Sequence, residues 1–296
     1  MFRKSHFNFH LIQLFIILSI FSVLSFPAHT DTKIPLAGRS PKAHFLYGQW
    51  DGDRYLVGVE INAGRGTKTY WRNPGDAGIS PQFDWEGSVN IGDIEVLWPA
   101  PMKLKETFPD SVLTTYGYET RVILPIWITP QKKNIPIQLN LFFEFGLCKE
   151  QCIPSDATFR ETLSPDRPKN DLSYAALSDI LKTVPIKKRL GIAENSLSIL
   201  KIEEASNPKA PQIKEIHVFA HVPPASGQPE LFVDLPKEWS FSDPVLEATK
   251  EEGQILFRFT ATPNRPIQTS TLKLVLVAGT HATETEIPLS SSEKHQ

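Results

Sequence analysis

The chain has 296 residues, of which 41% are hydrophobic and 22% charged, and its formal net charge is −2. This length suffices for one large or two ordinary domains, and the composition is neither collagen-like nor that of a disordered protein. Acidic and basic side chains are interspersed and form no basic stripe of the kind that nucleic acid requires, so we expect no nucleic-acid partner. Because proline lacks an N–H and ends helices, the 25 prolines favour short strands and turns over long helices.

Residues 1–30 are predicted to be a signal peptide. A short basic stretch precedes the apolar run 11–26, and no acidic residue comes before Asp31, which is the layout of a secretory signal. As a helix the run would span about 24 Å, short of a hydrocarbon core of roughly 30 Å. Phe26 lies two positions before Ala28, where a cleavage site prefers a small residue, so an uncleaved N-terminal anchor stays an alternative. In both cases the remainder of the chain is expected to be exported.

The segment 31–165 is predicted to be a β-sandwich domain. Its strand candidates are rich in β-branched and aromatic residues and are bounded by Pro, Gly, Asp or Asn. They are 44–50, 54–61, 67–72, 94–98, 120–128, 137–145 and 157–162. The turn-forming triplet at 51–53 joins the first two as a hairpin. About seven short strands within about 120 residues are typical of an all-β sandwich.

The segment 166–195 is predicted to be a linker with one short helix at 172–183, ended by Pro185. Strand signals return in 196–290, which predicts a second β-sandwich. The candidates there are 197–202, 216–221, 231–235, 255–260 and 272–277. The last residues, 291–296, are expected to be disordered. The predicted fold class is therefore all-β, with two sandwich domains joined by a linker.

The two cysteines of the chain, Cys148 and Cys152, are the candidate reactive site. An exported protein meets an oxidising compartment, and residues this close in a turn can approach the Cα separation of about 5.5–6 Å that a disulfide needs. On the chain-entropy model so short a loop removes only about 2 kcal/mol from the unfolded state, against roughly 4 for long loops. Redox use is therefore favoured, because the second thiol is always at hand to resolve a mixed disulfide. A stabilising staple stays open as the alternative.

Other site chemistries find little support. No metal or other cofactor is expected, because no histidine lies between His44 and His217 and no third thiol could complete a tetrahedral site. The pair His217 and His221 falls in a predicted strand, where an ordinary strand face is the favoured interpretation. The chain has no glycine-rich phosphate loop, no nucleophile elbow and no paired-histidine metal motif.

Several segments nevertheless resemble one family. Residues 69–78 read TYWRNPGDAG, and three further pieces follow in order: WPAP at 98–101, YGYE at 116–119, and Cys148-x3-Cys152 followed by Ile-Pro. Together they resemble the N-terminal domains of DsbD-like and ScsB-like thiol–disulfide interchange proteins over roughly residues 45–165. The second half is more loosely similar to the second immunoglobulin-like domain of the ScsB-like members.

The resemblance implies immunoglobulin-like folds in the periplasm and a redox pair made of Cys148 and Cys152. In such proteins the pair receives electrons from a membrane-embedded thiol donor and passes them to oxidised periplasmic thiol proteins, and the second cysteine, here Cys152, forms the mixed disulfide. The resemblance also places four aromatic residues near the pair, where they could shield it or serve only as core: Tyr70, Trp71, Tyr116 and Tyr118.

Two features depart from the family. The DsbD domain has a longer spacer between its cysteines, and full-length members continue into a membrane domain and a thioredoxin-like domain, neither of which this sequence contains. A separate membrane protein is therefore expected to reduce the pair. The preferred hypothesis is a periplasmic thiol–disulfide relay, an oxidoreductase whose clients serve disulfide isomerisation, cytochrome c maturation or copper tolerance. A non-catalytic envelope module with a permanent disulfide is the main alternative, and a copper(I) metallochaperone is a weaker one.

Overall fold

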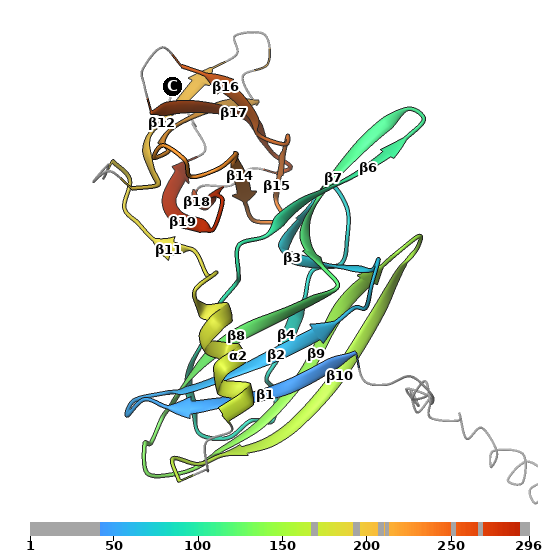
Figure 1. Cartoon of the computed structure of the whole chain (residues 1–296), viewed down its shortest axis with the longest axis vertical. Coiled ribbons are helices and arrows are strands. Elements are labelled where there is room, and N and C mark those ends of the chain that lie inside the picture. The colour runs from blue at the N-terminus through green and yellow to red at the C-terminus, as the bar shows by residue number, and fades with distance from the viewer. Residues whose placement is uncertain are drawn as a thin grey trace, which may run out of the picture. The chain divides into compact units, whose positions relative to one another are not determined.

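The computed structural model describes residues 42–166, 171–191, 196–206, 210, 213–249, 253–265 and 269–290. The predicted signal peptide and the predicted C-terminal tail lie outside these residues. The described elements are strands and one helix, which lies between the two halves of the chain (Figure 1). No helix among the described residues is long and apolar enough to cross a membrane.

The first half of the chain folds into two antiparallel sheets that face each other. The four-stranded sheet has the order β1-β2-β8-β5, and the second sheet has the order β10-β9-β3-β7-β6, with β4 also paired to β9. The strands of these two sheets are β1 (Ala43–Trp50), β2 (Tyr55–Asn62), β3 (Lys68–Gly75), β4 (Gln82–Asp84), β5 (Ile91–Val96), β6 (Met102–Phe108), β7 (Ser111–Glu119), β8 (Arg121–Pro130), β9 (Ile137–Cys148) and β10 (Cys152–Leu163). The hairpin predicted around residues 51–53 is confirmed, because β1 pairs antiparallel with β2.

The core of this sandwich follows from the two-residue period of its strands. Alternate side chains of β9 from Ile137 to Phe145 are buried in it, and those of β2 from Tyr55 to Ile61 meet them from the other sheet. The even-numbered positions of β9 face the opposite, outer side of their sheet, and Cys148 is one of them. The pleat alone therefore excludes the cysteine pair from the core.

The helix α2 (Asp171–Leu181) packs on the outer face of the four-stranded sheet (Figure 1). Leu177 is fully buried there against Leu56 and Ile123. Gly58 of β2 leaves room for that leucine, since a Cβ at position 58 would lie 2.6 Å from Leu177 Cδ2. The helix was predicted at 172–183 and is observed within two residues of those bounds.

The second half forms another pair of sheets, with the orders β11-β19-β18-β14 and β12-β13-β17-β15, and with β16 paired to β17. Its own apolar core lies between them. The strands are β11 (Ile186–Lys187), β12 (Ser198–Ser206), β13 (Lys214–His221), β14 (Pro229–Asp234), β15 (Trp239–Phe241), β16 (Val245–Ala248), β17 (Gln254–Pro263), β18 (Thr269–Ala278) and β19 (His281–Ser290). The all-β class with two sandwiches and one linking helix is thus confirmed. The domain boundaries at 165/166 and 195/196 stay predictions.

Several strands escaped the sequence analysis: β4, β6, β7, β11, β15, β16 and β19. The longest of them alternate threonine or charged residues with apolar ones, as in β6 (MKLKETF) and β19 (HATETEIPLS). Such strands have one wet face and few β-branched hydrophobic residues, so their periodicity is weak beside that of β8 or β9.

The two sandwiches contact each other through side chains that point away from the second core. Phe232 of β14 and Val275 of β18 belong to the core cluster of the first sandwich. Beside them, Arg72 of β3 forms ion pairs with Asp234 and Glu284, the first at 2.6 Å between Nε and Oδ2. The second sandwich therefore completes the packing around β3.

The close approach of α2 predicts a non-additive pair of substitutions. Gly58→Ala should lower the free energy of unfolding by about 1–3 kcal/mol, because the new methyl group overlaps Leu177. In a Leu177→Ala background, where that space is empty, the same change should cost at least about 1 kcal/mol less. Urea unfolding of the four proteins measures both effects. Equal costs in the two backgrounds would show that Gly58 does not hold the helix in place.

Candidate functional site

A disulfide closes the hairpin between β9 and β10. Cys148 is the last residue of β9 and Cys152 the first of β10, and the two face each other in register. Their sulfurs are bonded, and their Cα atoms lie 4.1 Å apart. A three-residue turn connects them, in which the Lys149 N–H donates to the Gln151 carbonyl. The pairing of β9 with β10 thus brings the two cysteines together before any sulfur chemistry takes place.

The two cysteines differ in exposure. The residue at 148 is only 3% exposed, whereas Cys152 is an exposed residue at the open edge of the sheet. Both side chains are on the outer face of the sheet, away from the core. A reacting sulfur from another molecule can therefore reach Cys152, while Cys148 is covered by its neighbours.

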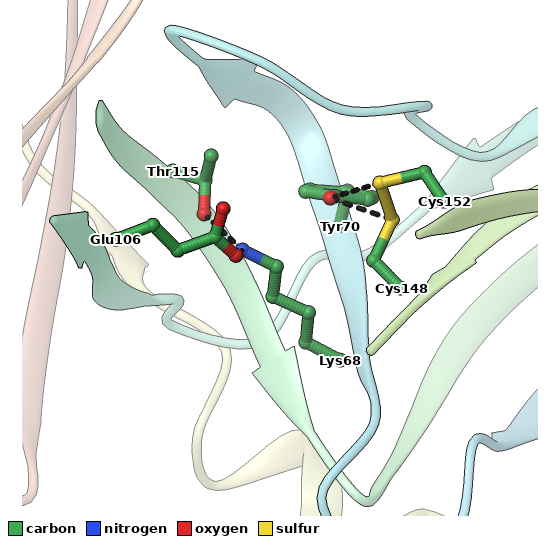
Figure 2. Close-up of a disulfide and its surroundings, with 6 residues drawn as sticks. All are labelled: Lys68, Tyr70, Glu106, Thr115, Cys148 and Cys152. Carbon is green, nitrogen blue, oxygen red and sulfur yellow. Dashed lines mark hydrogen bonds and ion pairs between the residues drawn. A yellow bond between two sulfur atoms is a disulfide. The ribbon is translucent and has the colours of Figure 1, made fainter. Parts of the chain in front are cut away.

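Tyr70 of β3 is one of the neighbours that contact the sulfurs. Its hydroxyl donates to Cys148 Sγ at 2.7 Å and lies 3.1 Å from Cys152 Sγ, as Figure 2 shows. Burial, with a smaller contribution from the negative charge of Glu106, raises the pKa of Tyr70 to about 12. The phenol therefore stays protonated at neutral pH and remains a hydrogen-bond donor to sulfur.

A polar group lies next to Tyr70 on the same face of the sheet (Figure 2). The Lys68 ammonium pairs with Glu106 and donates to Thr115 Oγ1 at 3.1 Å. It also lies 5.6 Å from the centre of the Tyr70 ring. A shallow depression of about 420 Å³ opens here, lined in part by Lys68, Glu106 and Cys148. Positive charge is thus held next to Tyr70, already balanced by a carboxylate.

The loop after β3 presses on the other side of the Tyr70 ring. Gly78 has a φ of +126°, and a Cβ there would lie 2.3 Å from Tyr70 Cε1. Gly146 is equally confined, since its Cβ would lie 2.7 Å from that of Ile79. Only glycine lets this loop and the β9 backbone close around the tyrosine.

The other three predicted aromatics make their contacts elsewhere. Trp71 and Tyr116 are fully buried, and both rings contact Phe232 of the second sandwich. The Tyr118 hydroxyl donates to the Pro99 carbonyl at 2.8 Å. Of the four, Tyr70 is the one whose hydroxyl touches the sulfurs. A shielding role for the aromatic residues stays a proposal.

Sequence reasoning missed Lys68, Glu106 and Thr115. Lys68 could have been found, because it stands two positions before Tyr70 in a predicted strand and must share its face. Glu106 and Thr115 carry no such signal, because they come from the unpredicted hairpin of β6 and β7. Elsewhere, His217 and His221 share one face of β13, and His217 Nε2 lies 2.9 Å from Glu215. The described residues contain no cluster of three metal-ligating side chains.

The comparisons with known proteins agree with this geometry. Residues 40–164 match the family model described as "Thiol:disulfide interchange protein DsbD, N-terminal". No curated protein matches the chain in sequence.

Among solved structures, the N-terminal periplasmic domain of ScsB from Proteus mirabilis superposes with a TM-score of 0.62 and 17% identity. The match covers 84% of this chain and 93% of that chain, and it extends the shared fold over both sandwiches. The C-terminal domain of the Streptococcus pyogenes antigen I/II-family protein AspA covers 84% of this chain and 99% of its own, with 7% identity and a TM-score of only 0.19. The segment 40–164, which contains Cys148 and Cys152, therefore matches the DsbD N-terminal domain model, and the chain shares its fold with the ScsB domain.

Proposed function

We propose that the protein is a thiol–disulfide relay that carries reducing equivalents in the periplasm. A membrane-embedded thiol protein reduces the Cys148–Cys152 disulfide, and the resulting dithiol then reduces oxidised envelope proteins. The observation that carries this proposal is the asymmetry of the disulfide, which joins one exposed and one buried cysteine at the tip of a hairpin. A staple would not need an accessible sulfur, whereas an exchanging pair does.

The reaction assigns a separate role to each sulfur. The Cys152 thiolate attacks one sulfur of the client disulfide, that bond breaks, and the other client sulfur leaves as a thiolate. A mixed disulfide now joins Cys152 to the client. The Cys148 thiolate then attacks Cys152 Sγ, which releases the second client thiolate and closes the protein disulfide. Two electrons pass to the client, whose two thiolates take up the two protons that the protein thiols lost.

Tyr70 is proposed to act on the buried sulfur. A thiolate at Cys148 would accept the phenol hydrogen bond that the disulfide sulfur accepts now, and hydrogen bonds to charged groups are worth more than neutral ones. The phenol would therefore stabilise the reduced, ionised pair relative to the disulfide. Its hydroxyl also contacts both sulfurs, which supports the shielding role.

The equilibrium reduction potential of the Cys148–Cys152 pair is the direct test of the relay. We expect a value above about −300 mV, the range in which disulfides exchange with thiol proteins. Equilibration of the protein with a glutathione series, read by mass after alkylation, measures it. A much lower potential, with no reduction by thioredoxin-like proteins, would make the disulfide permanent and the relay wrong.

Single-cysteine variants should separate the two sulfurs. Cys148→Ser leaves the exposed thiol, and we expect it to form a stable mixed disulfide with a small chromogenic disulfide. Cys152→Ser leaves the buried thiol, which should react at least about tenfold more slowly because reactive thiols need solvent access. The two variants control for each other, since each keeps one thiol on the same hairpin. Equal rates would contradict the assignment of Cys152 as the attacking residue.

Removal of the phenol oxygen should shift the thiol pKa and the potential together. In Tyr70→Phe the lowest thiol pKa of the reduced pair should rise by about 1 unit, the equivalent of a hydrogen bond of about 1.4 kcal/mol. Above that pKa the potential should become more negative by about 30 mV, because the ionised reduced form loses stabilisation. Thiolate absorbance against pH gives the first value and glutathione equilibration the second. Tyr118→Phe, whose hydroxyl contacts Pro99 instead, is the matched control and should change neither.

A further inference from the structure

β10 is an open edge of its sheet, and Cys152 is its first residue. The strand has 12 residues and pairs with β9 on one side. Within the described part of the chain, its other side has no backbone partner. The neighbouring β1 meets β10 through side chains further along, at Phe159 and Glu161. Unpaired strand edges are templates for the backbone of another chain.

The backbone of Cys152 is oriented toward that open side. Directly opposed residues of an antiparallel pair lie about 5.5 Å apart when they are hydrogen-bonded to each other and about 4.5 Å apart when they are not. The 4.1 Å between Cys148 and Cys152 marks a pair that is not hydrogen-bonded. The N–H and C=O of Cys152 therefore point away from β9, and every second residue repeats this orientation, so Pro154 and Asp156 do the same.

Pro154 supports this orientation independently. A proline has no N–H to give to a ladder, so within sheets it occupies edge positions whose N–H side faces solvent. Pro154 stands two residues after Cys152, at one of the outward positions, and its register partner is Gly146. The strand thus keeps its full pairing with β9 and offers the Cys152 and Asp156 amides, with three carbonyls, at the edge.

We propose that this edge, residues 152–156, binds an extended segment of the oxidised client protein, with the reacting client cysteine opposite Cys152. The segment pairs antiparallel, as the other strands of this sheet do, since only that pairing sets residues directly opposite each other. The inference rests on the relay function and specifies how the client is recognised.

The geometry fits displacement at sulfur, which needs the attacking and leaving sulfurs in line. The disulfide runs across the strands, because its two residues are register partners on neighbouring strands. A client cysteine on the added strand, on the same face, extends that line beyond Cys152. In the mixed disulfide, Cys148 then attacks Cys152 Sγ from one side while the client sulfur leaves from the other. The bond between Cys148 and Cys152 forms as the bond to the client breaks.

This edge recognises the backbone of the client segment more than its side chains. The face that carries Cys152 also carries Asp156 and Arg160, and all three residues are exposed. Client side chains on that face stay in water. The partner class is therefore any oxidised protein whose cysteine lies in an extended segment with free amides, without proline at the paired positions.

The test uses two chromogenic disulfides of thionitrobenzoate. One is a blocked pentapeptide with cysteine as its last residue and valine and threonine before it, and the other is N-acetylcysteine amide. In the antiparallel pairing its first residue lies opposite Asp156 and its third opposite Pro154. Reduced wild-type protein should release thionitrobenzoate from the pentapeptide at least about tenfold faster, the equivalent of one or two backbone hydrogen bonds. Asp156→Pro removes one outward amide and should lose this preference, whereas Asp156→Ala, the matched control, should keep it.

A second form of the test changes the pentapeptide and leaves the protein unchanged. N-methylation two residues before the cysteine blocks the amide that would donate to the Pro154 carbonyl and should abolish the preference. N-methylation one residue before it blocks an amide that faces away and should preserve it. The single-residue probe should react equally with all three proteins, which shows that their thiols and fold are intact.

Two results would overturn the proposal while leaving the relay standing: no preference of the wild-type protein for the pentapeptide, or equal pentapeptide rates for Asp156→Pro and Asp156→Ala. If both N-methylated peptides react alike, the edge is likewise not the docking site. Failure of the wild-type dithiol to reduce either probe would instead refute the relay, and the docking proposal with it.

Discussion

The two-residue period of β3 is the constraint on which the site and the packing around it both depend. Tyr70 points to the outer face of its sheet and touches the sulfurs, while Trp71, one residue later, points inward and contacts Phe232. A shift of one residue in the register of β3 would exchange these roles. Arg72, held by Asp234 and Glu284, opposes such a shift. The position of one phenol is thus fixed by ion pairs to the other half of the chain.

The reactive group lies on a sheet surface rather than in a cleft. Enzymes that enclose their substrates depend on a cavity to exclude water, but thiol–disulfide exchange between proteins needs only the approach of one sulfur along the line of a bond. The structure meets that need with a hairpin tip. The pairing of β9 with β10 aligns the bond, Tyr70 covers one sulfur, and the sheet edge leaves the other open.

Much of the fold was predictable from sequence, because strands with buried faces show strong alternation. The β1–β2 hairpin, β8, β9 and the helix α2 were all expected near their observed bounds. The cysteine pair was predictable too, since a short spacer between two cysteines puts them in one turn. Strands with a charged face, such as β6, were not predictable, and β7 was missed because threonine, tyrosine and glycine fill its buried positions. Glu106 of β6 was missed as well, because its position near Tyr70 depends on a strand pairing that no local pattern encodes.

The contact of Phe232 and Val275 with the first core has a consequence for how the chain can be divided. A cut after residue 165 would follow the sequence, but it would remove two side chains from a finished core and leave the Arg72 guanidinium, now only 19% exposed, without its carboxylates. Along the sequence, the chain consists of two sandwich-forming segments in tandem. The folded molecule is better regarded as one packed unit, because the second sandwich supplies part of the core of the first.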